Sequence, residues 1–251
     1  MCFPVTDFAT RYLKESMKTS RNVFDTQYRN FSSKAQRKYP SEGVIRFLLS
    51  NYGVLSQHQR NCCIVLDLGC GTGRNLWMIQ KEGFNVIGID SSLSGLQIAA
   101  QVLSDDWYLS CNLVGSNMQT LPFKNSCFDV VIDDVSMQHL NLLEAENTLK
   151  EIHRVLKVSG TFFSNRLGMN SSPAQLLKLK PNRVDSHTVF NISDQNLPLA
   201  GNGQTSFWDT EIVDELYFGA GFEVLEILRN HRTYHDDMGI EYLEIVAKEI
   251  W

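Results

Sequence analysis

The sequence predicts an α/β fold in which helices cover both faces of a doubly wound, mostly parallel β-sheet. Strand-like apolar runs alternate with amphipathic segments from about residue 61 to residue 165, and a glycine-rich turn follows the first run. The 251 residues are 43% hydrophobic and 20% charged, which supplies one sizeable core and argues against extensive disorder. Because strand and helix alternate, we expect right-handed parallel crossovers.

Residues 1–60 are predicted to form an N-terminal helical arm and lid, ahead of a main domain at residues 61–251. Aromatic residues recur along residues 8–31, and Pro40 and Ser41 open a helix that runs to Leu49. The first eleven residues lack a long apolar core, so they do not resemble a secretory signal. No apolar run reaches the length that spans a bilayer.

The first predicted strand leads into the most informative motif of the chain, VLDLGCGTGR at residues 65–74. The apolar run from Cys62 to Leu68 predicts a buried strand, and a helix begins near Leu76. Glycines at alternate positions allow backbone conformations that other residues avoid, and they let a ligand approach without meeting a Cβ atom. The free N–H groups of the helix start then face that ligand. The alternative is a glycine turn that serves only the fold.

Three further strands follow in the next 60 residues. Residues 83–90, GFNVIGID, predict a second strand that ends in Asp90. An acid about 20 residues after a glycine turn is placed to bind a nucleoside ribose, although Asp90 as a helix cap is the alternative. Strands are also expected near Leu113 and at residues 127–133, and the link between them has no helical periodicity.

The C-terminal half continues the alternation and then interrupts it. Asn141 and Glu144 form a near capping box for a helix that ends near Leu156, and a fifth strand follows. From Arg166 to Phe207 the pattern breaks down, and we interpret this segment as an acceptor-site insertion, with a disordered insertion as the alternative. A helix at residues 209–218 then leads into a closing pair of strands.

These blocks resemble the class I S-adenosylmethionine (SAM)-dependent methyltransferases. The family motifs match VLDLGCGTG, GSNMQTLPF at residues 115–123, SCFDVV at residues 126–131 and EIHRVLKVSG at residues 151–160, in the family's order. A dinucleotide fingerprint would instead place a third glycine where Arg74 stands. The resemblance covers residues 39–248. It implies a seven-stranded sheet in the order 3-2-1-4-5-7-6, with the seventh strand antiparallel.

The resemblance also implies a SAM site, which would release S-adenosylhomocysteine. Asn117 stands where the family has an acid that accepts a hydrogen bond from the adenine amino group. Its amide oxygen can accept the same bond more weakly, or Asn117 is only a turn residue. The expected cofactor-binding residues are Asp67, Gly69, Cys70, Gly71, Gly73, Asp90, Ser91, Asn117, Met118 and Asp133.

Candidate catalytic residues lie just after the fourth strand. The methyl group of SAM is already electrophilic, so methyl transfer is largely a matter of placing the acceptor. A hydroxyl or carbon acid also needs a base, for which the candidates are Asp133, Asp134 and His139. His139 has a suitable pKa range, and a structural histidine is the alternative.

Taken together, these features predict methyl transfer from SAM to a small-molecule acceptor. The net charge of −5 argues against a nucleic acid substrate. The six cysteines include no C-x-x-C pair, so no metal is expected. Cys62, Cys63 and Cys111 are predicted in buried strands, which fits a reducing cytoplasm. A SAM-binding regulatory or scaffold protein without turnover is the alternative function.

Overall fold

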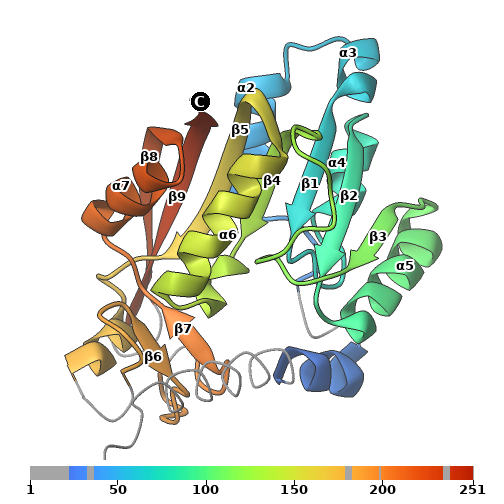
Figure 1. Ribbon diagram of the computed structural model, residues 1–251. Coiled ribbons are helices and arrows are strands. Elements are labelled where there is room, and N and C mark those ends of the chain that lie inside the picture. Colours follow the sequence, from blue (N-terminus) through green and yellow to red (C-terminus); the bar gives the residue numbers. More distant parts are fainter. Residues whose placement is uncertain (1–22, 33–36, 179–182, 198, 234–237, 251) are drawn as a thin grey trace, which may run out of the picture.

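The computed structural model describes residues 23–32, 37–178, 183–197, 199–233 and 238–250, so most of the predicted arm lies outside the described residues. A seven-stranded sheet runs in the order β3-β2-β1-β4-β5-β9-β8, with β1 to β5 parallel and β9 antiparallel to both its neighbours (Figure 1). Its strands are β1 (Ile64–Leu68), β2 (Asn85–Asp90), β3 (Asn112–Gly115), β4 (Phe128–Asp134), β5 (Leu156–Leu167), β8 (Phe222–Thr233) and β9 (Gly239–Glu249). The predicted order is confirmed, because β6 (Thr188–Phe190) and β7 (Gln204–Ser206) form a separate sheet.

Helices cover both faces of the large sheet. One hydrophobic cluster joins it to α2 (Glu42–Tyr52), α4 (Leu76–Lys81) and α5 (Leu93–Trp107), and another joins it to α6 (Leu142–Val155) and α7 (Thr210–Gly219). Neighbouring strand residues serve opposite faces, since Val65 belongs to the first cluster and Leu66 to the second. The apolar runs in the sequence therefore reflect strands that are buried on both sides.

A short helix that the sequence analysis missed changes the start of β1. Ser56 and Gln59 form a capping box that begins α3 (Gln57–Cys62). The first strand consequently starts at Ile64 rather than at Cys62. Cys62 is exposed, and Cys111 is half-buried just before β3, so the expectation of buried strand positions was wrong for both.

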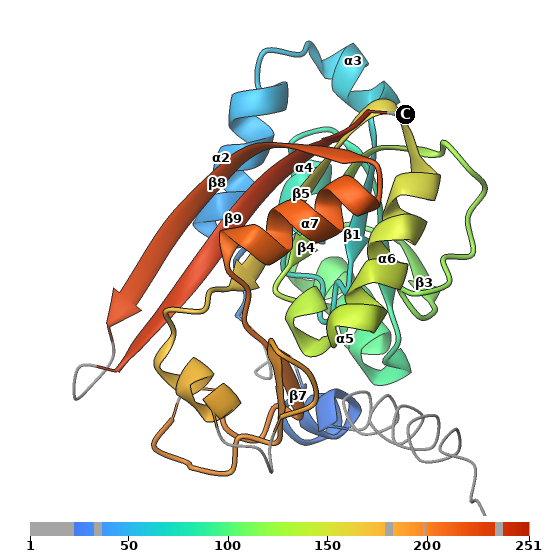
Figure 2. The same ribbon diagram turned by 60° about the vertical axis from the view of Figure 1, so that its left-hand side comes forward.

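The predicted insertion has more structure than its irregular sequence indicates. β5 continues through Arg166 and Leu167, and a 3-10 helix (Ser172–Lys178) and the β6–β7 sheet follow. These elements have a hydrophobic cluster of their own, which includes Val189, Ile192 and Phe207. Figures 1 and 2 place this unit and the helical residues 23–31 beside the carboxyl ends of the parallel strands.

A buried arginine joins the insertion to the large sheet. The Arg166 guanidinium lies 3.2 Å from the ring centroid of Trp208, and it donates hydrogen bonds to the Met137 carbonyl and to the Ser206 hydroxyl. Burial lowers the pKa of Arg166 to about 10, which leaves it charged at neutral pH. The β7 strand is thereby attached to the end of β5 and to the loop after β4.

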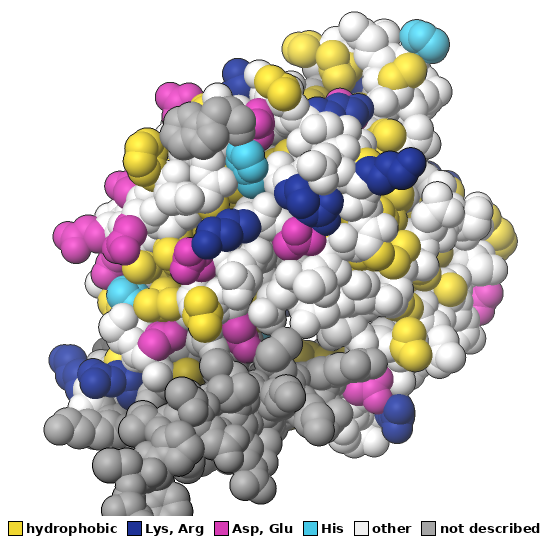
Figure 3. All heavy atoms as spheres, viewed as in Figure 1, with side chains coloured by type: hydrophobic (Ala, Val, Ile, Leu, Met, Phe, Trp, Pro, Cys, Tyr) yellow, Lys and Arg dark blue, Asp and Glu magenta, His cyan; other side chains and the backbone are white. Residues whose placement is uncertain are grey.

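The surface is mixed in charge on the side that Figure 3 shows. Among the residues drawn in colour, acidic and basic side chains are interspersed over this face rather than gathered into a basic patch. No helix within the described ranges has the length and apolar character needed to cross a membrane.

The start of α6 offers a test of the local fold. The Asn141 side chain accepts from the Glu144 N–H at 3.0 Å, and the Glu144 carboxylate accepts from the Asn141 N–H at 2.9 Å. Asn141→Ala should lower the free energy of unfolding by about 1 kcal/mol, because one helix N–H loses its acceptor. Asn141→Ser keeps a capping oxygen and should lose less. Urea denaturation measures both, and equal losses would contradict the cap.

Candidate cofactor and acceptor site

A cavity of about 1000 Å³ opens at the carboxyl ends of β1, β2 and β4. The loops after these strands line it, together with the helical residues 23–31, the β6–β7 unit and the ends of β8 and β9. Eight of the site residues predicted from the sequence line the cavity: Gly69, Cys70, Asp90, Ser91, Asn117, Met118, Asp134 and His139. The other four predicted site residues do not line the cavity and could affect a ligand only indirectly: Asp67, Gly71, Gly73 and Asp133.

The glycine turn is required by a close approach between loops. Gly69 has a φ of 70°, and a Cβ atom there would lie 2.3 Å from the Cβ of Ser136. The N–H groups of Gly69 and Cys70 both donate to the Ile89 carbonyl, at 2.8 and 2.9 Å. The loops after β1, β2 and β4 therefore meet at a position that only glycine can fill.

Asp90 supports the glycine turn and faces the cavity. Its carboxylate accepts from the Gly71 N–H at 2.9 Å and from the Ser92 N–H at 2.8 Å. The cap of α5 is Ser92, whose hydroxyl accepts from the Gly95 N–H, so the capping alternative for Asp90 was wrong. Asp90 lines the cavity, and a carboxylate there is a suitable acceptor for donors such as ribose hydroxyls.

The position of Asn117 is compatible with both roles expected for it, as a turn residue and as an acceptor for the adenine amino group. Its amide oxygen accepts from the Gln119 N–H at 3.0 Å, which forms an Asx turn, and its carbonyl accepts from the Thr120 N–H. The residue also lines the cavity. The amide oxygen has a second lone pair, so the turn leaves it able to accept one more hydrogen bond.

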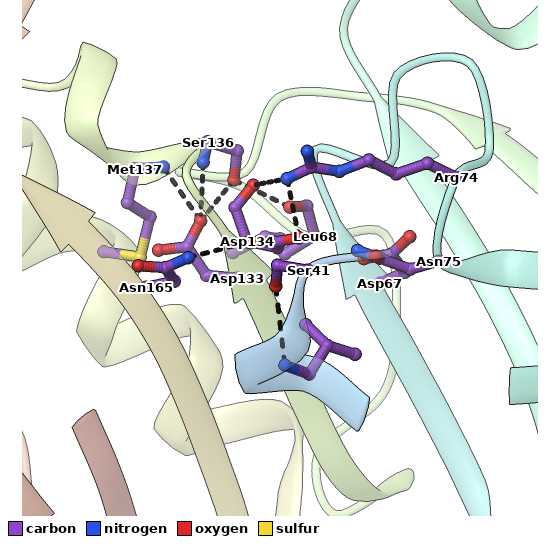
Figure 4. Close-up of polar contacts among 11 residues, drawn as sticks. Ser41, Asp67, Leu68, Arg74, Asn75, Asp133, Asp134, Ser136, Met137 and Asn165 are labelled. Carbon is purple, nitrogen blue, oxygen red and sulfur yellow. Dashed lines mark hydrogen bonds and ion pairs between the residues drawn. The ribbon is translucent and has the colours of Figure 1, made fainter. Parts of the chain in front are cut away.

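Asp133 is occupied by the protein itself. It is fully buried, and its carboxylate accepts from the Ser136 N–H, the Ser136 hydroxyl and the Met137 N–H (Figure 4). The carboxylate also accepts from the Ser164 hydroxyl. These bonds fix the course of the chain after β4. Because Asp133 does not line the cavity and its oxygens are engaged, we correct its assignment as a base and as a cofactor ligand.

Asp67 also lies behind the cavity. It is buried, and one of its oxygens accepts from the Asn75 amide at 3.1 Å. Burial raises the pKa of Asp67 to about 7, an effect that the Asn75 hydrogen bond opposes. Asp67 therefore connects β1 with the start of α4. It can affect a ligand only indirectly, through the glycine turn that follows β1.

Asp134 lies in an ion pair on the cavity wall. The Arg74 guanidinium is 2.6 Å from one Asp134 oxygen, and the Asn165 amide donates to the other at 3.0 Å (Figure 4). The Asp134 side chain is only 1% exposed, so this carboxylate depends on both partners. The sequence analysis used Arg74 only to argue against a dinucleotide fingerprint, so it did not predict this ion pair. No local sequence pattern marks Asn165.

His139 is held in one tautomer. Its Nδ1 lies 3.0 Å from the Gln204 carbonyl, which can only accept, so Nδ1 carries the proton. Nε2 then accepts from the Gln138 amide at 3.2 Å. Burial lowers the pKa of His139 to about 4, so the ring is neutral at pH 7. The Phe24 ring lies 4.6 Å from the imidazole, centroid to centroid.

Residues 65–160 match the family model of a methyltransferase domain. The chain is 31% identical over 163 residues to a ubiquinone/menaquinone biosynthesis C-methyltransferase of Wigglesworthia glossinidia brevipalpis, covering 62% of this chain and 63% of that one. It is 29% identical over 169 residues to a demethylmenaquinone methyltransferase of Lactococcus lactis, covering 64% and 66%. An uncharacterized protein of Methanocaldococcus jannaschii is 38% identical over 99 residues, covering 39% and 34%. The chain therefore spans less than two thirds of the length of each relative.

A solved structure confirms the fold. A 1,6-didemethyltoxoflavin-N1-methyltransferase of Burkholderia thailandensis, solved with S-adenosylhomocysteine bound, superposes with a TM-score of 0.68. The superposition covers 100% of this chain and 94% of that one at 16% sequence identity. At this identity the similarity applies to the fold alone.

The environment of His139 predicts an unusual titration. Its folded pKa of about 4 lies below the unfolded value of about 6.5, so the unfolded chain binds more protons between these pH values. As pH falls through this window, the free energy of unfolding should fall by up to about 3 kcal/mol on account of His139.

Asp67 contributes with the opposite sign between about pH 7 and pH 4, because its folded pKa is raised. The test therefore compares the free energy of unfolding of wild type with that of His139→Asn as a function of pH, measured by urea denaturation. An NMR titration of the imidazole gives the pKa directly. An NMR midpoint near 6.5, with no difference between the two proteins, would contradict the lowered pKa of His139.

Proposed function

We propose that the chain is a class I SAM-dependent methyltransferase and that it transfers a methyl group from SAM to a small-molecule acceptor. The observation that carries this proposal is the single cavity in which the loops after β1, β2 and β4 meet the β6–β7 unit. One half is built from the methyltransferase motif and the other from the arm and the insertion. When bound, SAM supplies an electrophilic methyl group on a sulfonium.

The first half of the cavity fits the parts of SAM. We assign the ribose hydroxyls to the Asp90 carboxylate and the adenine amino group to the Asn117 amide oxygen. The amino-acid end of SAM carries a carboxylate and an ammonium group. Arg74 and Asp134 offer the two opposite charges on the same wall, so we assign that end to them.

The second half is assigned to the acceptor. Phe24 and Tyr28 come from the arm, His139 from the loop after β4, and Asn202 and Gln204 from the insertion. A concave site made by several segments favours a small molecule over a polymer. Five described cysteines are free, in support of a reducing compartment such as the cytoplasm.

The experiment that tests the function uses methyl-labelled SAM. The purified chain is incubated with labelled SAM and a small-molecule extract of the organism that encodes it, and labelled products are identified by mass spectrometry. We expect a labelled small molecule that is absent without the protein. Tight binding of SAM with no labelled product would instead favour a SAM-binding regulatory or scaffold protein.

Asp90 gives the first quantitative prediction on the cofactor. Asp90→Ala should weaken SAM by about 2–3 kcal/mol, the scale for losing hydrogen bonds to a charged acceptor. Calorimetry with SAM and S-adenosylhomocysteine measures this loss. Asp106→Ala, which removes an exposed acid at the far end of α5, is the matched control and should bind normally. Normal affinity in Asp90→Ala would restrict Asp90 to supporting the turn.

Asn117 gives a second prediction. Asn117→Ala should weaken SAM more than it weakens the purine analogue that lacks the adenine amino group, because only SAM loses a hydrogen bond. Asn117→Asp should keep or improve the affinity for SAM, since an ionised acceptor binds more strongly. Equal losses for both ligands in Asn117→Ala would leave the side chain with its turn role only.

A further inference from the structure

Three oxygen-bearing side chains lie next to one another across the sheet on the cavity wall. Asp134 in β4 pairs in register with Asn165 in β5, and Asn165 pairs with Glu244 in β9. Directly paired residues point to the same face of a sheet, and all three line the cavity. We call Asp134, Asn165 and Glu244 the oxygen row. They are separated by 31 and 79 positions in the sequence, so only the sheet brings them together.

Each end of the oxygen row has an arginine, and its centre has none. Arg74 pairs with Asp134, and Arg46 pairs with Glu244, which also accepts from the Asn230 amide at 2.7 Å. Asn165 donates its amide nitrogen to Asp134, which fixes the orientation of the amide. Its amide oxygen is buried and has no hydrogen-bond partner within the described structure.

Two neighbouring amides on the cavity wall repeat this arrangement. Gln138 and Gln204 are 5% and 2% exposed, and their oxygens also lack partners among the described residues. Their nitrogens are engaged, that of Gln138 by His139 and that of Gln204 by Glu144 and the His139 carbonyl. Buried acceptors without donors are costly, so a ligand whose N–H or O–H groups reach these oxygens would gain favourable hydrogen bonds.

We propose that the acceptor is a nitrogen nucleophile, an amine whose N–H groups are bound by the Asn165 amide oxygen and the Glu244 carboxylate. This inference rests on the proposed methyl transfer and specifies its substrate class. Asp134, at the other end of the oxygen row, remains assigned to the cofactor. Asn165 and Glu244 are then the residues that determine specificity for nitrogen.

The chemistry of the transfer suits this wall. The lone pair of a neutral amine forms the new N–C bond while the C–S bond breaks, and the electron pair of that bond stays on sulfur as the thioether. The positive charge passes from sulfur to nitrogen, and the new ammonium then loses a proton to water. Fixed oxygen atoms that face the nitrogen stabilise the charge as it develops there.

An alcohol acceptor fits the same wall less well. It must lose its proton as the new bond forms, which requires a base beside the oxygen. The wall carboxylates Asp134 and Glu244 are each paired with an arginine. The unprotonated Nε2 of His139 accepts from the Gln138 amide, and burial lowers the pKa of this imidazole to about 4. An amine that binds in its neutral form needs no such base before transfer, whereas an ammonium must first lose a proton to water.

The atom that receives the methyl group tests the proposal directly. SAM carrying a ¹³C-methyl group is incubated with the full chain and the small-molecule extract, and the product is examined by one-bond ¹³C–¹H correlation NMR. The methyl chemical shift distinguishes attachment to nitrogen, oxygen, sulfur and carbon. We expect an N-methyl signal, and an O-, S- or C-methyl product overturns the inference while leaving methyl transfer in place.

A binding experiment supplies a readout that needs no turnover. Chain saturated with S-adenosylhomocysteine is screened by thermal shift against primary amines and alcohols of the same carbon skeletons. Amines should raise the melting temperature more often and further than their paired alcohols. A preference for alcohols, or no hit in either set, overturns the inference.

Variants then assign the effect to the two specificity residues. Glu244→Gln and Asn165→Leu should each reduce kcat/KM for the N-methylated acceptor by about 10- to 100-fold, the range for a hydrogen bond to a charged group. In Glu244→Gln, affinity for S-adenosylhomocysteine should stay within about threefold, because Glu244 does not contact the residues assigned to the cofactor. Glu241→Gln is the control, because Glu241 also lies in β9 beside an arginine but outside the cavity lining.

The outcomes separate the two proposals. Unchanged kcat/KM in Glu244→Gln, which keeps the shape of the side chain, overturns the role of the oxygen row even if Asn165→Leu fails to fold. Absence of any labelled product from a chain that binds S-adenosylhomocysteine overturns the proposed methyl transfer itself.

Discussion

The close contact between Gly69 and Ser136 is the constraint on which the site depends. Ser136 donates its hydroxyl to the Leu68 carbonyl at 2.7 Å and occupies the space that a side chain at Gly69 would need. Asp133 maintains this contact, because its buried carboxylate holds the backbone of Ser136 and Met137. Asp133 therefore shapes the cavity without lining it, through the position that it gives to Ser136.

The carboxylates around the cavity differ in role because they differ in partners. Asp90 accepts from backbone N–H groups and remains open to the cavity, whereas Asp133 is fully enclosed. Asp134 is paired with Arg74 in a buried position, where an unpaired charge would be costly. Arg166 supplies a nearby positive charge for Asp133. One short acidic stretch thus provides both a structural anchor and half of a charged pair.

Local motifs made the sheet predictable from the sequence, together with several residues that line the proposed cofactor half of the cavity. The glycine turn, the acid at Asp90 and the Asn141 capping box each act within a few residues, so their patterns are visible in one stretch of chain. α3 was missed because a six-residue helix with no buried residues has no apolar periodicity. Asp133 was misassigned because adjacent acids look alike in a sequence, while only register and loop course decide which one faces a cavity.

The acceptor half was hidden for a different reason. Asn165 and Glu244 become neighbours through strand pairing, and Gln204 reaches His139 because Arg166 and Trp208 attach the insertion to the sheet. Such contacts leave no mark in a single sequence. In the proposed assignment the cofactor contacts come from the loops after β1, β2 and β4, whereas most acceptor contacts come from the arm, β5, β9 and the insertion. The fold can therefore change its acceptor through long-range packing while its donor site is preserved.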